Sequence, residues 1–94
     1  MSEVKGKLIV KGGTKEYGSN GFKKRTFVIE IPDGEYPQKV EFELVQAKCA
    51  LLDPIEVGDD VKLTYNLRGR EWTNPEGEVK YFNSLQAWKL EIVF

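Results

Sequence analysis

Two neighbouring segments of the chain alternate apolar and polar residues, and this alternation constrains the fold more than any other feature. In both segments every second residue is large and apolar: Phe27, Ile29, Ile31, Val40, Phe42 and Leu44. Side chains of a β-strand point alternately to the two faces of its sheet, so a period of two predicts strands with one buried face. The turn residues Pro32-Asp33-Gly34 separate the two segments. The pattern therefore predicts an all-β chain in which successive strands pair across short turns.

Five strands and one short helix account for the whole sequence. We expect strands over residues 4–11, 23–31, 38–45, 61–72 and 79–94, and a helix over residues 47–52 that ends before Pro54. This order fits a five-stranded Greek-key OB-fold barrel with one short helix between strands three and four. An SH3-like barrel also has five strands, but the helical insert favours the OB-fold. Gly6 within the first strand is expected to mark sharp curvature.

Length and rare residue types exclude most other kinds of protein. The 94 residues show no repeat, linker or acidic tail, so we expect a single OB-fold domain over residues 1–94. The sequence has no His and one cysteine, Cys49, which excludes an intrachain disulfide, a cysteine-based zinc site and a His-activated nucleophile. We therefore expect no enzyme, metal or cofactor, a cytoplasmic location, and Cys49 in the core. No apolar run approaches the roughly 18–20 residues of a membrane span.

Charge is distributed unevenly along the chain. The formal net charge of −1 argues against a nucleic-acid-binding protein, since such domains are usually basic. Residues 5–25, however, hold seven Lys or Arg and one Glu, whereas residues 30–60 hold nine acidic and two basic residues. The sum conceals a basic first third and an acidic middle.

The fourth expected strand combines basic and aromatic residues on one face. By parity its core face holds Val61, Leu63, Tyr65 and Leu67. Arg68, Arg70 and Trp72 share the opposite face, where two guanidinium groups lie beside a large ring. Basic groups interleaved with rings can bind a single strand by phosphate contacts and base stacking. The alternative is that the arginines are solvated charges and that Trp72 closes the barrel end.

Further basic and aromatic residues are expected to join this surface. The predicted nucleic-acid-binding residues are Phe22, Lys23, Lys24, Arg25, Lys39, Arg68, Arg70, Trp72, Lys80 and Tyr81. Phe22 and Trp88 fit either the core or the binding site, and for Trp88 the core is the favoured position. Reading a duplex would need a helix for the major groove, and the expected helix has only about two turns.

Residues 57–81 resemble the fourth strand and following hairpin of bacterial single-stranded DNA-binding protein (SSB). The similar elements are the strand entry Val57-Gly58-Asp59-Asp60-Val61 and the stretch from Leu67 to Tyr81 (LRGREWTNPEGEVKY). A looser similarity to short, single-domain SSB-like proteins covers nearly the whole chain. The resemblance implies an OB-fold that binds single-stranded DNA, with Trp72 stacking on bases and Arg68 and Arg70 contacting phosphates. Glu71 stands where the family often has Lys, and Val45 stands where a stacking aromatic is common.

Three functions follow as hypotheses. The first is coating of single-stranded DNA with little sequence preference, in replication, recombination or repair. The second is an OB-fold protein-interaction module of a replication or recombination complex, with weak nucleic-acid binding. The third is binding of RNA. We also expect a homo-oligomer, a dimer or tetramer, formed through strand edges such as that of residues 4–11, with replication proteins as further partners and no membrane association.

Overall fold

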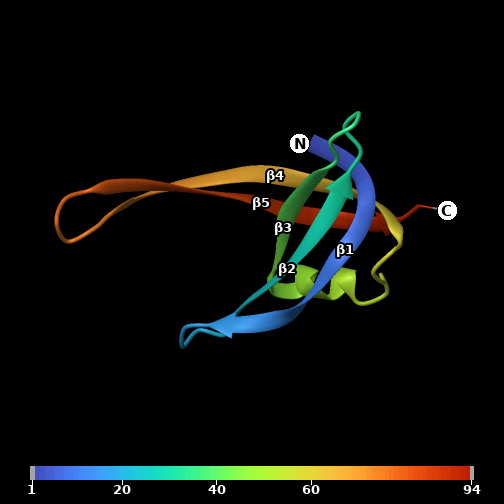
Figure 1. Ribbon diagram of the computed structural model, residues 1–94. Helices are drawn as coiled ribbons and strands as arrows, with labels where there is room; N and C mark the ends of the chain where they lie inside the picture. The colour runs from blue at the N-terminus through green and yellow to red at the C-terminus, as the bar shows by residue number, and fades with distance from the viewer. Residues whose placement is uncertain (1, 94) are drawn as a thin grey trace.

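Five strands and one short helix follow one another along residues 2–93, the part of the chain that the computed structural model describes (Figure 1). The elements are β1 (Ser2–Tyr17), β2 (Phe22–Ile31), β3 (Gln38–Val45), the 3₁₀ helix η1 (Gln46–Leu52), β4 (Asp60–Thr73) and β5 (Val79–Ile92). The strands close into a barrel in the order β1-β2-β3-β5-β4. Neighbours are antiparallel except β3 and β5, which run parallel. The predicted five-stranded OB-fold barrel, with a short helix between strands three and four, is confirmed.

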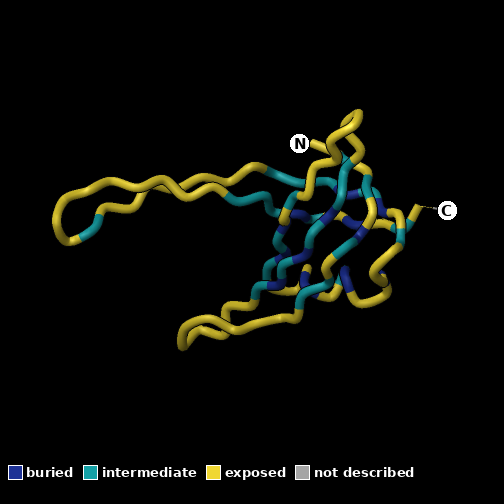
Figure 2. The backbone as a smooth tube through the Cα atoms, in the orientation of Figure 1, coloured by how far each residue is buried: buried dark blue, intermediate teal, exposed yellow. Residues whose placement is uncertain are grey.

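The alternating segments build the core of the barrel. Phe27 stacks on Phe42 with ring centroids 5.8 Å apart, and Tyr65 meets the edge of Phe42 at 5.2 Å. Cys49 and Leu52 of η1 are buried in the same cluster, so the predicted core position of Cys49 is confirmed. Figure 2 shows the buried residues gathered in the barrel and nearly none outside it.

The hairpin of β4 and β5 extends well beyond the barrel. β4 pairs with β1 only as far as Tyr65, whereas its ladder with β5 continues to the pair of Thr73 and Val79. Residues 67–85 therefore form a two-stranded projection, here called the ribbon (Figures 1 and 2). Leu67, predicted for the core face, is 72% exposed because β4 has left the barrel at that point. That prediction was wrong.

β1 crosses from one part of the sheet to another near Gly6. Ser2–Lys7 pair with β4, and from Lys7 onward the strand pairs with β2. Gly6 lies against Ile29 and Glu30 at this crossing, in agreement with its predicted role in curvature. β1, the strand whose edge was predicted to mediate self-association, therefore pairs with both β2 and β4 within the barrel.

Gly6→Ala is expected to destabilise the protein by about 2 kcal/mol or more, because an added methyl group overpacks the crossing. A Cβ atom at this position would lie 2.5 Å from the Glu30 carbonyl oxygen and closer still to Ile29 Cγ2. Urea unfolding followed by circular dichroism measures the change. Gly13→Ala is the matched control, since a Cβ there meets nothing within 4 Å. Equal unfolding midpoints for the two variants would contradict the prediction.

Candidate nucleic-acid interface

The ribbon has two faces of different chemistry, because residues alternate between the faces of each strand. Arg68, Arg70 and Trp72 of β4 lie opposite Ser84, Phe82 and Lys80 of β5, respectively. We call this the basic face. The opposite face carries Leu67, Gly69, Glu71, Thr73, Val79, Tyr81, Asn83 and Leu85.

Cross-strand contacts hold the aromatic residues of the basic face in place. The rings of Trp72 and Phe82 meet edge to face, with centroids 6.4 Å apart and planes at 63°. The Arg70 guanidinium lies over Phe82, with its Cζ atom 5.6 Å from the ring centroid. A lone two-stranded hairpin is only marginally stable in water, and pairs of this kind stabilise it. The contacts therefore pre-position two rings and a cation on one surface.

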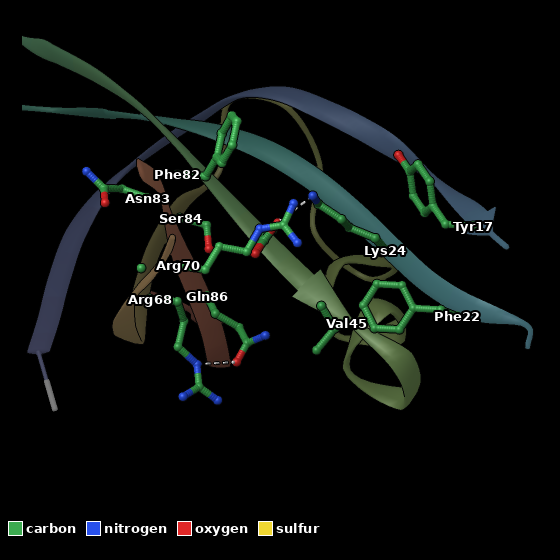
Figure 3. A pocket seen from close by; sticks show the side chains of 12 residues that line it. Tyr17, Phe22, Lys24, Val45, Arg68, Arg70, Phe82, Asn83, Ser84 and Gln86 are labelled. Carbon is green, nitrogen blue, oxygen red and sulfur yellow. Dashed lines mark hydrogen bonds and ion pairs between the residues drawn. The ribbon is translucent and has the colours of Figure 1, made fainter. Parts of the chain in front are cut away.

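A groove of about 690 Å³ lies where the ribbon leaves the barrel (Figure 3). Its rings come from the β1–β2 hairpin and the ribbon: Tyr17, Phe22 and Phe82. Its cationic groups are Lys24, Arg68 and Arg70, and its polar lining comes from Glu43, Asn83, Ser84 and Gln86. The groove continues along the basic face, since Arg68, Arg70 and Phe82 belong to both.

The cations of the groove are oriented by neighbouring side chains. Lys24 Nζ lies 2.9 Å from Glu43 Oε2 and 5.9 Å from the centroid of the Tyr17 ring. Arg68 donates from Nε to Gln86 Oε1 at 3.4 Å, which leaves its terminal N–H groups unengaged by that contact. Both cations can turn N–H donors to an anion entering the groove.

The structure brings six of the predicted site residues onto one surface. Phe22, Lys24, Arg68 and Arg70 line the groove, and Trp72 and Lys80 continue the basic face. Three others lie elsewhere. Tyr81 is on the opposite face of the ribbon beside Glu71, with its hydroxyl 3.5 Å from Glu71 Oε1. Lys23 and Lys39 do not line the groove, and Lys39 lies near the far end of β3 opposite Glu30.

Arg25 requires a correction, because the structure buries it in place of presenting it to a ligand. Only 8% of the residue is exposed. Its Nε donates to the Gly12 carbonyl at 2.8 Å, and one terminal nitrogen donates to the Cys49 carbonyl at 3.1 Å and to Asp53 Oδ1 at 2.6 Å. The predicted contact of Arg25 with nucleic acid is therefore wrong. Arg25 shares the strand parity of Phe27 and Ile29, which places it on the core side.

Two aromatic residues of the surface were not predicted from the sequence. Phe82 has the same parity as Lys80, which was the available signal for placing it on the basic face. Tyr17 pairs with Phe22 across the β1–β2 hairpin, but nothing local to Tyr17 indicated that this hairpin lies near the ribbon. Trp88 is partly buried on β5, outside the residues that line the groove, and its Nε1 is buried with no hydrogen-bond partner among the described residues.

The described residues hold neither a candidate metal cluster nor a helix suited to a membrane. Within residues 2–93, no group of three or more His, Cys, Asp or Glu side chains is placed to hold a metal ion. In the same part of the chain, no helix has the length and apolar character needed to cross a membrane.

The barrel order, the helix between β3 and β4, and the long β4–β5 hairpin define an OB-fold barrel. The chain belongs to the family described as "Domain of unknown function (DUF3127)", which matches residues 3–91. No curated protein matches the sequence.

Solved structures of SSB proteins share this fold. Two structures of Rim1, the mitochondrial single-stranded DNA-binding protein of S. cerevisiae, superpose with TM-scores of 0.69 and 0.67 at 10% and 12% identity. Each match covers 98% of this chain and 92% of the other. The SSB of Plasmodium falciparum, in complex with single-stranded DNA, gives a TM-score of 0.64 at 16% identity, covering 99% of this chain and 93% of the other. The predicted resemblance to SSB is confirmed at the level of the fold.

Proposed function

We propose that this protein binds single-stranded DNA along the groove and the basic face of the ribbon. One observation carries the proposal: four rings and four cations lie on one continuous surface. The rings are Tyr17, Phe22, Trp72 and Phe82, each between 39% and 48% exposed, and the cations are Lys24, Arg68, Arg70 and Lys80. A half-exposed ring that is held by its neighbours keeps surface free for a base. The names of Rim1 and of the Plasmodium SSB, both single-stranded DNA-binding proteins, support the same function.

In this proposal, base stacking and phosphate contacts make different contributions to the affinity. Each stacked base contributes roughly 1–3 kcal/mol and any base can stack, so binding tolerates many sequences. The cations hold the phosphates and supply the salt-dependent part of the affinity. Such a protein coats single strands exposed in replication, recombination or repair. The single buried cysteine, Cys49, supports a cytoplasmic location, since a free thiol is typical of a reducing compartment.

Titrating the protein with oligo(dT) at increasing salt tests the proposal directly. We expect quenching of tryptophan fluorescence and a slope of log K against log[salt] of about −3, from four cations at about −0.7 each on a single strand. Lys80→Ala is expected to make the slope of log K against log[salt] less negative by about 0.7. Lys39→Ala, a cation outside the groove, serves as control and leaves the slope unchanged. Absence of quenching at low salt would refute the proposal.

A second candidate function rests on the opposite face of the ribbon. Leu67, Val79 and Tyr81 are large apolar or aromatic side chains exposed on that face, where a partner protein could cover them. This face favours the alternative of an interaction module in a replication or recombination complex, or of a homo-oligomer, dimer or tetramer. Recovery of protein partners after nuclease treatment, together with DNA affinity of micromolar or weaker, would favour the module. Light scattering measures self-association.

RNA is the alternative nucleic-acid ligand, because stacking and phosphate contacts do not by themselves distinguish it from DNA. Competition between DNA and RNA strands of equal length and matching base sequence separates the two ligands.

A further inference from the structure

The groove contains a carboxylate that a surface built only to follow phosphates would exclude. Glu43 lines the groove together with Lys24, Arg68 and Arg70, and its side chain is 14% exposed. A carboxylate repels the phosphates of a nucleic-acid strand that lies beside it, because both groups are negatively charged. Lys24 offsets part of that repulsion, with its Nζ atom 2.9 Å from Glu43 Oε2. The pair leaves Oε1 and further lone pairs of the carboxylate free to accept hydrogen bonds.

An amide donor lies beside this acceptor. Glu43 and Gln86 are direct partners where β3 and β5 run parallel, and both side chains line the groove. The Gln86 Oε1 atom already accepts a hydrogen bond from Arg68 Nε at 3.4 Å. The Gln86 group that remains for a ligand is therefore its NH₂, a donor. The wall of the groove thus offers the Glu43 carboxylate as an acceptor next to an amide donor, that of Gln86, whose side chain is labelled in Figure 3.

This arrangement matches one base better than the others. The Watson–Crick edge of guanine presents two adjacent donors, N1–H and the N2 amino group, next to the acceptor O6. A carboxylate can accept both donors, and an amide NH₂ beside it can donate to O6. Cytosine and adenine each offer a single amino group on this edge, and thymine offers a single N–H. Single-stranded bases are unstacked enough to present this edge to a protein.

We propose that Glu43 and Gln86 form a base-reading subsite that prefers guanine, with Lys24 positioning the carboxylate. This inference rests on the proposed binding of single-stranded DNA and adds a specificity to it. The rings accept any base by stacking, whereas the subsite discriminates at the one nucleotide whose edge faces β3 and β5. Preference is therefore modest along a strand and local to this part of the groove.

The experiment compares three DNA strands of about 15 nucleotides, near the upper site size of one OB-fold. The first is all thymidine, the second repeats thymidine-thymidine-guanosine, and the third carries inosine in place of each guanosine. Isolated guanosines avoid four-stranded structures, and inosine lacks only the N2 amino group. For the wild-type protein, fluorescence anisotropy is expected to show about tenfold tighter binding of the guanosine strand than of the thymidine strand. Inosine is expected to remove most of that preference.

Two glutamine substitutions separate base reading from charge. Glu43→Gln is expected to bring the ratio of guanosine to thymidine affinity near one, while thymidine affinity stays the same or rises because a negative charge is gone. Glu41→Gln removes an exposed carboxylate from the same face of β3, outside the groove, and is expected to keep the wild-type ratio.

The outcomes distinguish this inference from the function on which it rests. Equal binding of the guanosine and thymidine strands by the wild-type protein overturns the guanine subsite and leaves DNA binding in place. A preference that Glu43→Gln preserves also overturns it, since the carboxylate then plays no part in reading the base. Failure to bind any of the three strands overturns the proposed function, and the subsite with it.

Discussion

Replacing both Trp72 and Phe82 by alanine is expected to weaken oligo(dT) binding about a hundredfold or more. The two rings share the basic face, and each is only about half exposed because it leans on the other. Loss of one stacked base costs roughly 1–3 kcal/mol, and two losses near the lower part of that range multiply to about a hundredfold. Fluorescence anisotropy of end-labelled oligo(dT) measures the change without relying on Trp72 as reporter.

The two single variants show how far the rings act together. Each ring orients the other, so truncating one also releases its neighbour, and each single variant is expected to lose more than half of the binding free energy that the double variant loses. Removal of Phe82 further frees Arg70, whose guanidinium lies 5.6 Å from the Phe82 centroid. Phe82→Ala is therefore expected to reduce binding even if no base stacks directly on Phe82.

Tyr81→Ala is the matched control, because it removes an exposed ring from the opposite face of the same strand. If bases stack on the basic face, Tyr81→Ala leaves affinity within about twofold of wild type. Equal losses in Tyr81→Ala and the double variant would assign the effect to disruption of the ribbon. An affinity of the double variant close to wild type would show that the rings do not bind bases.

The sequence predicts the barrel well because its strands obey a local rule. Phe27, Ile29, Phe42 and Leu44 are buried as their alternation requires, and the short helix lies where the pattern changes. The rule fails at Leu67, which continues the apolar parity of β4 beyond the barrel. Parity tells which residues share a face, but whether that face is covered depends on where β1 stops pairing with β4.

Part of the candidate site is likewise beyond local reasoning. The residues of β4 could be placed on one face from the sequence, whereas their partners on β5 depend on the length of the intervening turn. That turn sets Trp72 opposite Lys80 and Arg70 opposite Phe82, and leaves Tyr81 on the other face. The approach of the β1–β2 hairpin to the ribbon is a tertiary feature, so Tyr17 carried no signal.

Arg25 shows how one basic cluster can divide between binding and stability. Lys24 and Arg25 are adjacent on β2, so their side chains leave opposite faces of the strand. Lys24 reaches the groove, whereas Arg25 links two segments through three acceptors: Gly12 of β1, and Cys49 and Asp53 of η1 and its end. Only a planar guanidinium with several donors can serve all three acceptors.

Arg25→Met is therefore expected to lower the free energy of unfolding by about 3 kcal/mol, measured by urea denaturation. Methionine fills much of the space of the arginine stem but leaves the Gly12 and Cys49 carbonyls without this donor. Asp53 adds little to the loss, because its side chain is 69% exposed and stays solvated.

Arg25→Lys is expected to recover part of this stability, since a single ammonium group keeps the charge but cannot reach three acceptors in a fixed fork. Lys24→Met provides the contrast. It removes a single ion pair, between a Lys24 side chain that is 36% exposed and the Glu43 carboxylate, so we expect a smaller loss of stability than for Arg25→Met, together with a loss of DNA affinity. At temperatures where Arg25→Met is still folded, its affinity for oligo(dT) is expected to match wild type. Weaker binding by folded Arg25→Met with unchanged stability would return Arg25 to the binding surface and contradict its assignment to the core.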